Sequence, residues 1–250
     1  MSSSPEHQDP PKPNIERPTL NGRVVAVVGG SRGIGFAIAQ TAAREGARAA
    51  LVARDPRRLR SAARRIEGAI AIAADVTQPA EVRRAFSEIR QRLARLDVLV
   101  NSAGTFTFKP FEQTSLHKWH SNLEANLTSL FLTTQAALPL LAQSRGQVVN
   151  ILSISSRRAF ANCSAYTASK FGALGFTRVL AEELRAKGIR VTAVLPGATD
   201  TRLVRAFGFS INRANLVQPA DVADAVIVAI KAASRTTVEE IVVTPSHGSL

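Results

Sequence analysis

The sequence predicts a single α/β domain, with a doubly wound parallel sheet of about seven strands and helices on both faces. Short apolar runs alternate with helix patterns along the chain, and each run is apolar throughout rather than at every second residue. Strands of this kind are buried on both faces, as in a parallel sheet that helices cover on each side. The chain has 250 residues, 45% of them hydrophobic, which is enough for one core of this size.

The expected elements follow one another in strict alternation. Strands are predicted at residues 23–28, 49–53, 69–73, 98–100, 147–152, 189–194 and 238–243. Helices are predicted at residues 33–44, 56–67, 79–93, about 112–142, about 164–186 and 219–232, and a short lid-like segment precedes the last helix. Ligands of such sheets bind outside the carboxyl ends of the strands, so the residues after each strand are the candidates for a site.

The chain is expected to begin with a flexible tail. Residues 1–19, MSSSPEHQDPPKPNIERPT, are rich in Pro and Ser and lack apolar periodicity, so the folded domain is placed at residues 20–250. No uninterrupted apolar run is long enough to span a membrane, which predicts a soluble protein. The single cysteine, Cys163, cannot form an intrachain disulfide and fits the cytoplasm. No Cys/His cluster has the spacing of zinc ligands, so no metal is expected.

The net charge of +13 raises the question of nucleic-acid binding. The basic residues are partly spread over helix patterns, as at Arg83, Arg90 and Arg95, and no binding motif accompanies them. A solvated, arginine-rich surface explains them, and no nucleic-acid partner is expected. Positive charge is concentrated in residues 44–65, which contain eight arginines and only two carboxylates.

A glycine loop follows the first expected strand, in the segment VVGGSRGIG. Residues without a Cβ allow a sharp turn there, and a pyrophosphate can approach the backbone N–H groups at the start of the next helix. A plain strand-to-helix connection uses the same residue types. The loop residues predicted to hold a dinucleotide are Gly29, Ser31, Arg32, Gly33, Ile34 and Gly35.

With its G-x-x-x-G-x-G spacing, the sequence resembles the short-chain dehydrogenase/reductase family over about residues 21–244. The resemblance continues, in the family's order, with Asp75-Val76, Asn101-Ser102-Ala103-Gly104, Asn126, Ser153, Tyr166-x-x-x-Lys170 and Pro196-Gly197. It implies a Rossmann domain and a dimer or tetramer formed through the helices near residues 112–142 and 164–186. The cofactor contacts that it implies beyond the glycine loop are Asp75, Val76, Asn101, Ala103, Gly104, Tyr166, Lys170, Pro196, Gly197, Thr199 and Thr201.

Tyr166 and Lys170 lie four residues apart, on one face of an expected helix. An ammonium near a phenol favours the phenolate and lowers the pKa of the tyrosine from its usual value of about 10. The family resemblance makes Tyr166 the general acid/base and lets Lys170 also bind the nicotinamide ribose. It assigns Ser153 to hydrogen-bond the reacting oxygen and Asn126 to hold a water that links Lys170 to solvent.

Charge at the end of the second strand favours NADP(H) over NAD(H). Enzymes that bind NAD usually place a carboxylate there, whereas a 2′-phosphate requires cations. Here Arg54 occupies this position and Arg32 lies in the glycine loop, although Asp55 follows directly. The alternative is that Arg54 is one more surface arginine.

Two residues depart from the family pattern. Val28 stands where the family usually has Thr, and Ser102 replaces the second Asn of its N-N-A-G motif. The usual Thr hydroxyl helps to tie the first turn to the loop after the fourth strand. That tie is therefore expected to be weaker here or to be carried by Ser102.

These features predict an NADP(H)-dependent oxidoreductase that interconverts a carbonyl and an alcohol. The residues expected near the substrate are mostly apolar, which indicates an uncharged, apolar compound: Phe106, Phe108, Phe160, Cys163, Leu203, Val204, Phe207 and Phe209. The alternatives are a 3-oxoacyl-thioester reductase whose basic surface docks an acidic carrier protein, an alcohol dehydrogenase working oxidatively, and a noncatalytic NADP(H)-binding regulator. The presence of Tyr166, Lys170 and Ser153 argues against the regulator. The sequence does not identify the substrate.

Overall fold

Seven parallel strands form one sheet in the order β3-β2-β1-β4-β5-β6-β7, in a computed structural model that describes residues 19–205 and 213–248. Their bounds are β1 Val24–Val28, β2 Arg48–Ala53, β3 Ile70–Ala73, β4 Val98–Asn101, β5 Gln147–Ile151, β6 Arg190–Pro196 and β7 Glu240–Val243. The predicted doubly wound sheet is therefore confirmed. The predicted tail at residues 1–19 lies outside the described residues, apart from Thr19.

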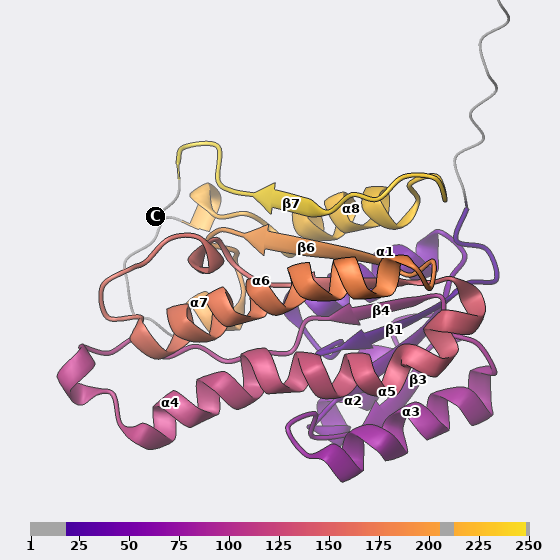
Figure 1. Cartoon of the computed structure of the whole chain (residues 1–250), viewed down its shortest axis with the longest axis horizontal. Coiled ribbons are helices and arrows are strands. Elements are labelled where there is room, and N and C mark those ends of the chain that lie inside the picture. The colour runs from indigo at the N-terminus through magenta and orange to yellow at the C-terminus, as the bar shows by residue number, and fades with distance from the viewer. Residues whose placement is uncertain (1–18, 206–212, 249–250) are drawn as a thin grey trace, which may run out of the picture.

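Helices cover both faces of the sheet (Figure 1). One layer contains α1 Gly33–Arg44, α2 Pro56–Ala63 and α8 Pro219–Ile230. The other contains α3 Pro79–Leu93, α5 Ser129–Ser144 and α6 Ser164–Arg185. Neighbouring residues of β1 point to opposite layers, since Val25 packs in the first core and Val24 in the second. This arrangement explains why every residue of the strand is apolar.

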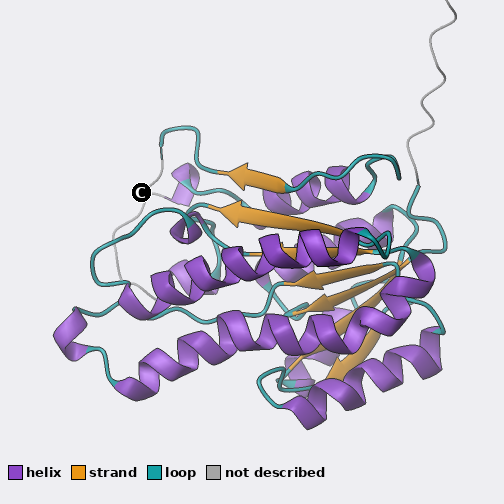
Figure 2. Cartoon of the chain, viewed as in Figure 1, coloured by secondary structure: helices purple, strands orange, loops and turns teal. Residues whose placement is uncertain are grey.

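The helix expected at residues 112–142 is not one helix. A 3-10 turn at Phe111–Gln113 comes first, and α4 begins at Leu116 because the Ser115 hydroxyl accepts a hydrogen bond from the Lys118 N–H, at 3.3 Å. A π-helical turn at Glu124–Thr128 then joins α4 (Leu116–Leu123) to α5. α4, the π-helical turn and α5 therefore form one continuous helical segment, which lies beside α6 (Figure 2). The ends of the other elements differ from the expected ends by a few residues. The largest difference is at α2, which was expected to end at residue 67 and ends at Ala63.

The order in which successive strands are added to the sheet reverses between β1 and β4, although all strands stay parallel. The first three strands run from β1 to β3 toward one edge, and β4 to β7 run toward the other. At this point the connection after β1 leads to α1 on one face of the sheet and the connection after β4 leads to α5 on the other, which in doubly wound sheets is where a ligand crevice opens. Within the described part of the chain, no helix is long and apolar enough to cross a membrane.

Candidate active site

A cavity of about 580 Å³ lies at the carboxyl ends of the strands. It extends from arginines after β2 to the phenol of Tyr166 on α6, and residues from the loops after β1 to β6 line it. Eighteen of the predicted site residues line this one cavity: Gly29, Ser31, Arg32, Gly33, Ile34, Arg54, Asp75, Val76, Ala103, Gly104, Asn126, Ser153, Tyr166, Lys170, Pro196, Gly197, Thr199 and Thr201.

Two predicted cofactor contacts, Gly35 and Asn101, do not line the cavity. A Cβ on Gly35 would lie 2.6 Å from the carbonyl oxygen of Gly29, so this glycine lets α1 pack closely against its own loop. Asn101 is buried, donates to the side-chain oxygen of Asn150 at 2.9 Å and accepts from Thr133 at 2.8 Å. Its side chain connects the sheet to α5, because a buried amide needs partners for both its oxygen and its nitrogen.

The first turn of the glycine loop needs glycine for two reasons. Gly29 has φ +81°, and a Cβ there would lie 2.6 Å from the backbone N of Ala103. The loop after β4 therefore lies directly against the loop after β1. A backbone hydrogen bond holds this contact, since the Ser102 N–H donates to Val28 O at 2.8 Å, while the Gly29 N–H donates to Val52 O at 2.8 Å and joins the turn to β2. The Ser102 bond ties the first turn to the loop after β4, although Val28 lacks the hydroxyl that the family usually has at this position.

The start of α1 offers backbone N–H groups to the cavity. Arg32 precedes the helix in an extended conformation, and in the described part of the chain no side chain caps the helix and no acidic residue lies in its first turn. Uncapped N–H groups and the positive end of the helix dipole attract an anion. The close-packed glycines and this helix start fit the diphosphate of a dinucleotide.

Four arginines line the same cavity, and two of them, Arg58 on α2 and Arg202 after β6, were not predicted as site residues. Burial lowers the pKa of Arg32, and the charges of Arg58, Arg202 and Arg54 lower it further. The sequence signal for Arg58 was its place in the dense basic stretch, whereas Arg202 comes close to Arg32 only through the fold. Together these side chains form a positive region that suits phosphate groups.

The carboxylates beside the arginines are already engaged. Asp55 accepts hydrogen bonds at 3.0 Å from the N–H groups of Arg57 and Arg58, capping α2, and these bonds lower the pKa of its carboxyl. Asp75 lies 3.5 Å from Arg54 and accepts from the Thr77 hydroxyl at 2.8 Å. Burial opposes ionisation of Asp75, but the Thr77 hydrogen bonds and the Arg54 charge leave its pKa below the usual value.

Tyr166, Ser153 and Lys170 meet at the other end of the cavity. Ser153 follows β5 and hydrogen-bonds the Tyr166 phenol, while its Oγ also accepts from the Ser155 N–H at 3.1 Å. Lys170 lies one helical turn beyond Tyr166, with Nζ 5.8 Å from the centre of the phenol ring. Nζ also donates to the carbonyl oxygen of Ile151 at 3.2 Å, which anchors the amine to the end of β5.

The pKa of Tyr166 differs from the expectation. Burial raises it to about 12, Cys163 adds to the increase, and the hydrogen bond with Ser153 only partly opposes it. Burial also lowers the pKa of Lys170 to about 8. The pKa of the phenol therefore moves away from neutrality in this arrangement, against the expectation, because loss of water on burial is the largest influence on it.

Asn126 lies in the π-helical turn and is 1% exposed. Its side-chain nitrogen donates to the Thr105 carbonyl at 3.0 Å and to the Ser169 hydroxyl at 2.9 Å, and its oxygen accepts from the Thr105 N–H at 2.9 Å. The amide thereby fixes the loop after β4 against α6. Its expected role in holding a water next to Lys170 stays a prediction.

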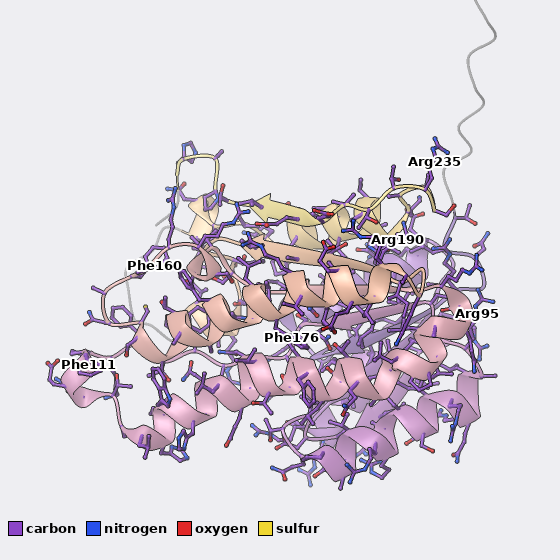
Figure 3. The ribbon with its side chains drawn as sticks, viewed as in Figure 1. Arg95, Phe111, Phe160, Phe176, Arg190 and Arg235 are labelled. Carbon is purple, nitrogen blue, oxygen red and sulfur yellow. The ribbon has the colours of Figure 1, made fainter. Side chains whose placement is uncertain are left out.

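An aromatic side chain packs against the phenol, and others lie at the same end of the molecule. The Phe106 ring packs edge-on against Tyr166, with the ring centroids 4.3 Å apart. Phe111 and Phe160 lie at the end of the molecule toward which the strands point, opposite Arg95 (Figure 3). Leu203 and Val204 line the cavity, while Phe207 and Phe209 lie outside the described residues. Burial raises the pKa of the Cys163 thiol, which keeps it protonated.

The fold and the site together define a class of protein, the oxidoreductases built on a doubly wound dinucleotide-binding sheet. Within this class, the chain belongs to the short-chain dehydrogenase family, whose model matches residues 23–209. No three His, Cys, Asp or Glu side chains gather as metal ligands in the described parts of the chain.

Two curated relatives are similar over most of the chain. An uncharacterized oxidoreductase of Staphylococcus saprophyticus is 33% identical over 90% of this chain and 98% of its own length. A 3-oxoacyl-[acyl-carrier-protein] reductase of Bos taurus is 38% identical over 78% of this chain and 83% of its own.

Two solved structures share the fold. An alcohol dehydrogenase of the archaeon Thermococcus sibiricus, complexed with 5-hydroxy-NADP, has a TM-score of 0.85 and 28% identity over 91% of this chain and 98% of its own. A metagenomic short-chain oxidoreductase in complex with NADP has a TM-score of 0.79 and 32% identity with the same coverage.

Proposed function

We propose that the protein is an NADP(H)-dependent oxidoreductase that interconverts a carbonyl and an alcohol. The observation that carries this proposal is the continuity of the cavity. The glycine loop and the arginines line one end of the cavity. The Tyr166 phenol lines the other end, beside Ser153 and Lys170. A dinucleotide bound along it would bring its nicotinamide to the phenol.

The preference for NADP(H) rests on the charges at the end of β2. Arg32, Arg54 and Arg58 line the cavity there, and the carboxylate of Asp55 caps α2. A carboxylate used in this way is poorly available to a ribose 2′-OH, whereas guanidinium groups suit a 2′-phosphate. Both solved structures described above also contain NADP or a derivative of it.

The cofactor would supply or accept a hydride at its nicotinamide ring. The protein's own groups handle the proton and the charge on the substrate oxygen. Ser153 donates a hydrogen bond to that oxygen, and Tyr166 gives it a proton as the carbonyl is reduced. Lys170 lies close enough to favour a negative charge on Tyr166 after the proton has left.

The raised pKa of Tyr166 favours the reductive direction near neutral pH. A phenol with a pKa of about 12 keeps its proton and is ready to donate it. Alcohol oxidation would instead need the phenolate, which is the minor form under these conditions. The apolar surroundings, which include Phe106, Leu203 and Val204, favour an uncharged carbonyl compound.

The proposal is tested by a panel of ketones, aldehydes and secondary alcohols, assayed with NADPH and with NADH. We expect carbonyl reduction with NADPH at lower cofactor concentrations than with NADH, and Arg54→Gln should weaken NADPH binding while leaving NADH binding unchanged. Stronger binding of NADH than of NADPH by the wild type would contradict the cofactor assignment. Tight NADPH binding without turnover of any compound would favour a regulatory protein.

The similarity to the bovine 3-oxoacyl-[acyl-carrier-protein] reductase favours a second, narrower function. In that case the substrate is a 3-oxoacyl thioester, and the net charge of +13 helps to attract an acidic carrier protein. Acetoacetyl groups attached to coenzyme A and to an acyl carrier protein distinguish the possibilities. A lower KM for the carrier-bound form, lost at high salt, is the expected result for the narrower function.

We also propose that the protein forms a homo-oligomer through α5 and α6. Phe131 on α5 and Phe171 and Val179 on α6 are about half exposed, which is unusual for large apolar side chains. The family resemblance places subunit contacts on these helices. Light scattering during gel filtration should give a dimer or tetramer, and Phe171→Asp should shift it toward the monomer.

A further inference from the structure

The segment that follows β6 lies directly over the start of α1. A Cβ added to Gly33, which begins that helix at φ +57°, would lie 3.4 Å from Cγ2 of Thr201. Thr201 is therefore in near contact with the turn whose N–H groups face the cavity. Arg202 is the next residue and begins the short helix α7, Arg202–Arg205. The backbone of Arg202 therefore lies next to the proposed diphosphate position, and its side chain lines the cavity.

Among the described residues, Arg202 has no carboxylate to neutralise it. Within the described residues, no ion pair involves Arg202, although Arg54, Arg58 and Arg213 each lie within 4.0 Å of an aspartate. The charge of Arg202 acts on Arg32, whose pKa is lowered by burial and by the surrounding arginines. Two neighbouring guanidinium groups repel each other unless an anion lies between them. The start of α1, which no described side chain caps, lines the same cavity.

We propose that Arg202 binds the diphosphate of the cofactor opposite the N-terminus of α1 and so fixes α7 over the substrate end of the cavity. This inference rests on the proposed dinucleotide binding. The next two residues, Leu203 and Val204, line the cavity. An anion held by Arg202 therefore sets where these apolar side chains lie.

The geometry separates Arg202 from the arginines that follow β2. Arg54 and Arg58 belong to β2's loop and α2, where a 2′-phosphate would lie, whereas Arg202 adjoins Thr201 and Gly33. The diphosphate is present in both NADPH and NADH, and the 2′-phosphate only in NADPH. Arg202 is therefore expected to act on both cofactors equally.

The test measures the dissociation constants of NADPH and NADH for the wild type and three variants, by calorimetry at low salt. Arg202→Gln should weaken both cofactors by about the same factor, on the order of tenfold, since one charge-assisted hydrogen bond is lost. Arg57→Gln is the matched control, because Arg57 is an exposed neighbour of Arg58 that does not line the cavity. It removes the same charge and should change both constants less than twofold.

The outcomes are distinct. Unchanged binding in Arg202→Gln, or a loss confined to NADPH, would overturn the inference and leave the proposed function intact. Failure of the wild type to bind either cofactor would overturn both. The placement of α7 has its own readout at saturating NADPH, where Arg202→Gln should raise the KM for the carbonyl substrate. Arg202→Lys keeps the charge and should recover part of both losses, and an unchanged carbonyl KM would refute the role of α7.

Discussion

Lys170→Met is expected to stabilise the cofactor-free protein at pH 7. Lys170 is 5% exposed, and burial lowers its pKa from 10.5 to about 8. At about 1.4 kcal/mol for each pH unit between these values, the buried ammonium opposes folding by about 3 kcal/mol. Methionine has a similar length and carries no charge. It loses the charge-assisted hydrogen bond to the Ile151 carbonyl, worth about 2 kcal/mol, which leaves a net gain of about 1 kcal/mol.

The sign of the pH dependence follows from the lowered pKa. The folded protein releases the Lys170 proton near pH 8, whereas the unfolded chain keeps it until about pH 10.5. Wild-type stability therefore rises over this interval relative to the variant, and the advantage of Lys170→Met should disappear by pH 10.5. Groups common to both proteins cancel in this difference.

The assay is urea unfolding of both proteins at pH 7 and pH 10.5, at one fixed protein concentration because oligomers respond to concentration. Lys187→Met, at an exposed lysine just beyond α6, serves as the control and should show no such dependence. A Lys170→Met variant that is less stable than the wild type at pH 7 would refute the reasoning. An advantage that stays the same at both pH values would do so as well.

The remaining predictions concern the loop after β1, the π-helical turn and the direction of catalysis. Gly29→Ala should destabilise the protein by about 3 kcal/mol, because it combines a positive φ with a Cβ 2.6 Å from the Ala103 backbone N. Gly68→Ala has a similar φ and no neighbour within 4 Å, so urea unfolding should show a loss of only about 1 kcal/mol, and equal losses would count against the close contact. Asn126→Ala should cost about 2–4 kcal/mol by the same assay, since it leaves buried partners at Thr105 and Ser169 unpaired, and a loss below about 0.5 kcal/mol would argue against this role. The raised pKa of Tyr166 predicts that the rate of alcohol oxidation increases from pH 7 to pH 9, and a flat profile would show that the phenolate does not limit it.

The sheet was predictable because buried parallel strands are apolar throughout, as Val24–Val28 is, and local turn chemistry punctuates them. The spacing of Tyr166 and Lys170 predicted one shared helix face, because helix geometry alone decides which residues share a face, and both residues line the same cavity.

Features that depend on the tertiary environment were not predictable in this way. The π-helical turn adds a residue to a turn without any change in apolar pattern, so residues 112–142 look like one helix. Asn101 follows the family motif, yet its amide is used by Asn150 and Thr133. The pKa of Tyr166 depends on how much water the fold removes, which spacing alone does not indicate.

The participation of Arg202 was not visible from the sequence for a related reason. It lies 170 residues from Arg32 along the chain, and only the crossing of the segment after β6 over α1 places its charge near the glycine loop. Arg58, by contrast, stands four residues after Arg54 and was within reach of a charge-pattern argument.

A single turnover with bound NADPH tests most directly whether Tyr166 delivers the proton. Wild type and Tyr166→Phe are each saturated with NADPH, mixed rapidly with a carbonyl compound that the wild type reduces, and followed by the loss of the reduced nicotinamide signal. The phenylalanine ring keeps the contact with Phe106, and with both proteins saturated with NADPH hydride transfer should slow at least about a hundredfold in the variant. Transfer at the wild-type rate in the variant, with NADPH bound equally well, would contradict the role assigned to the phenol.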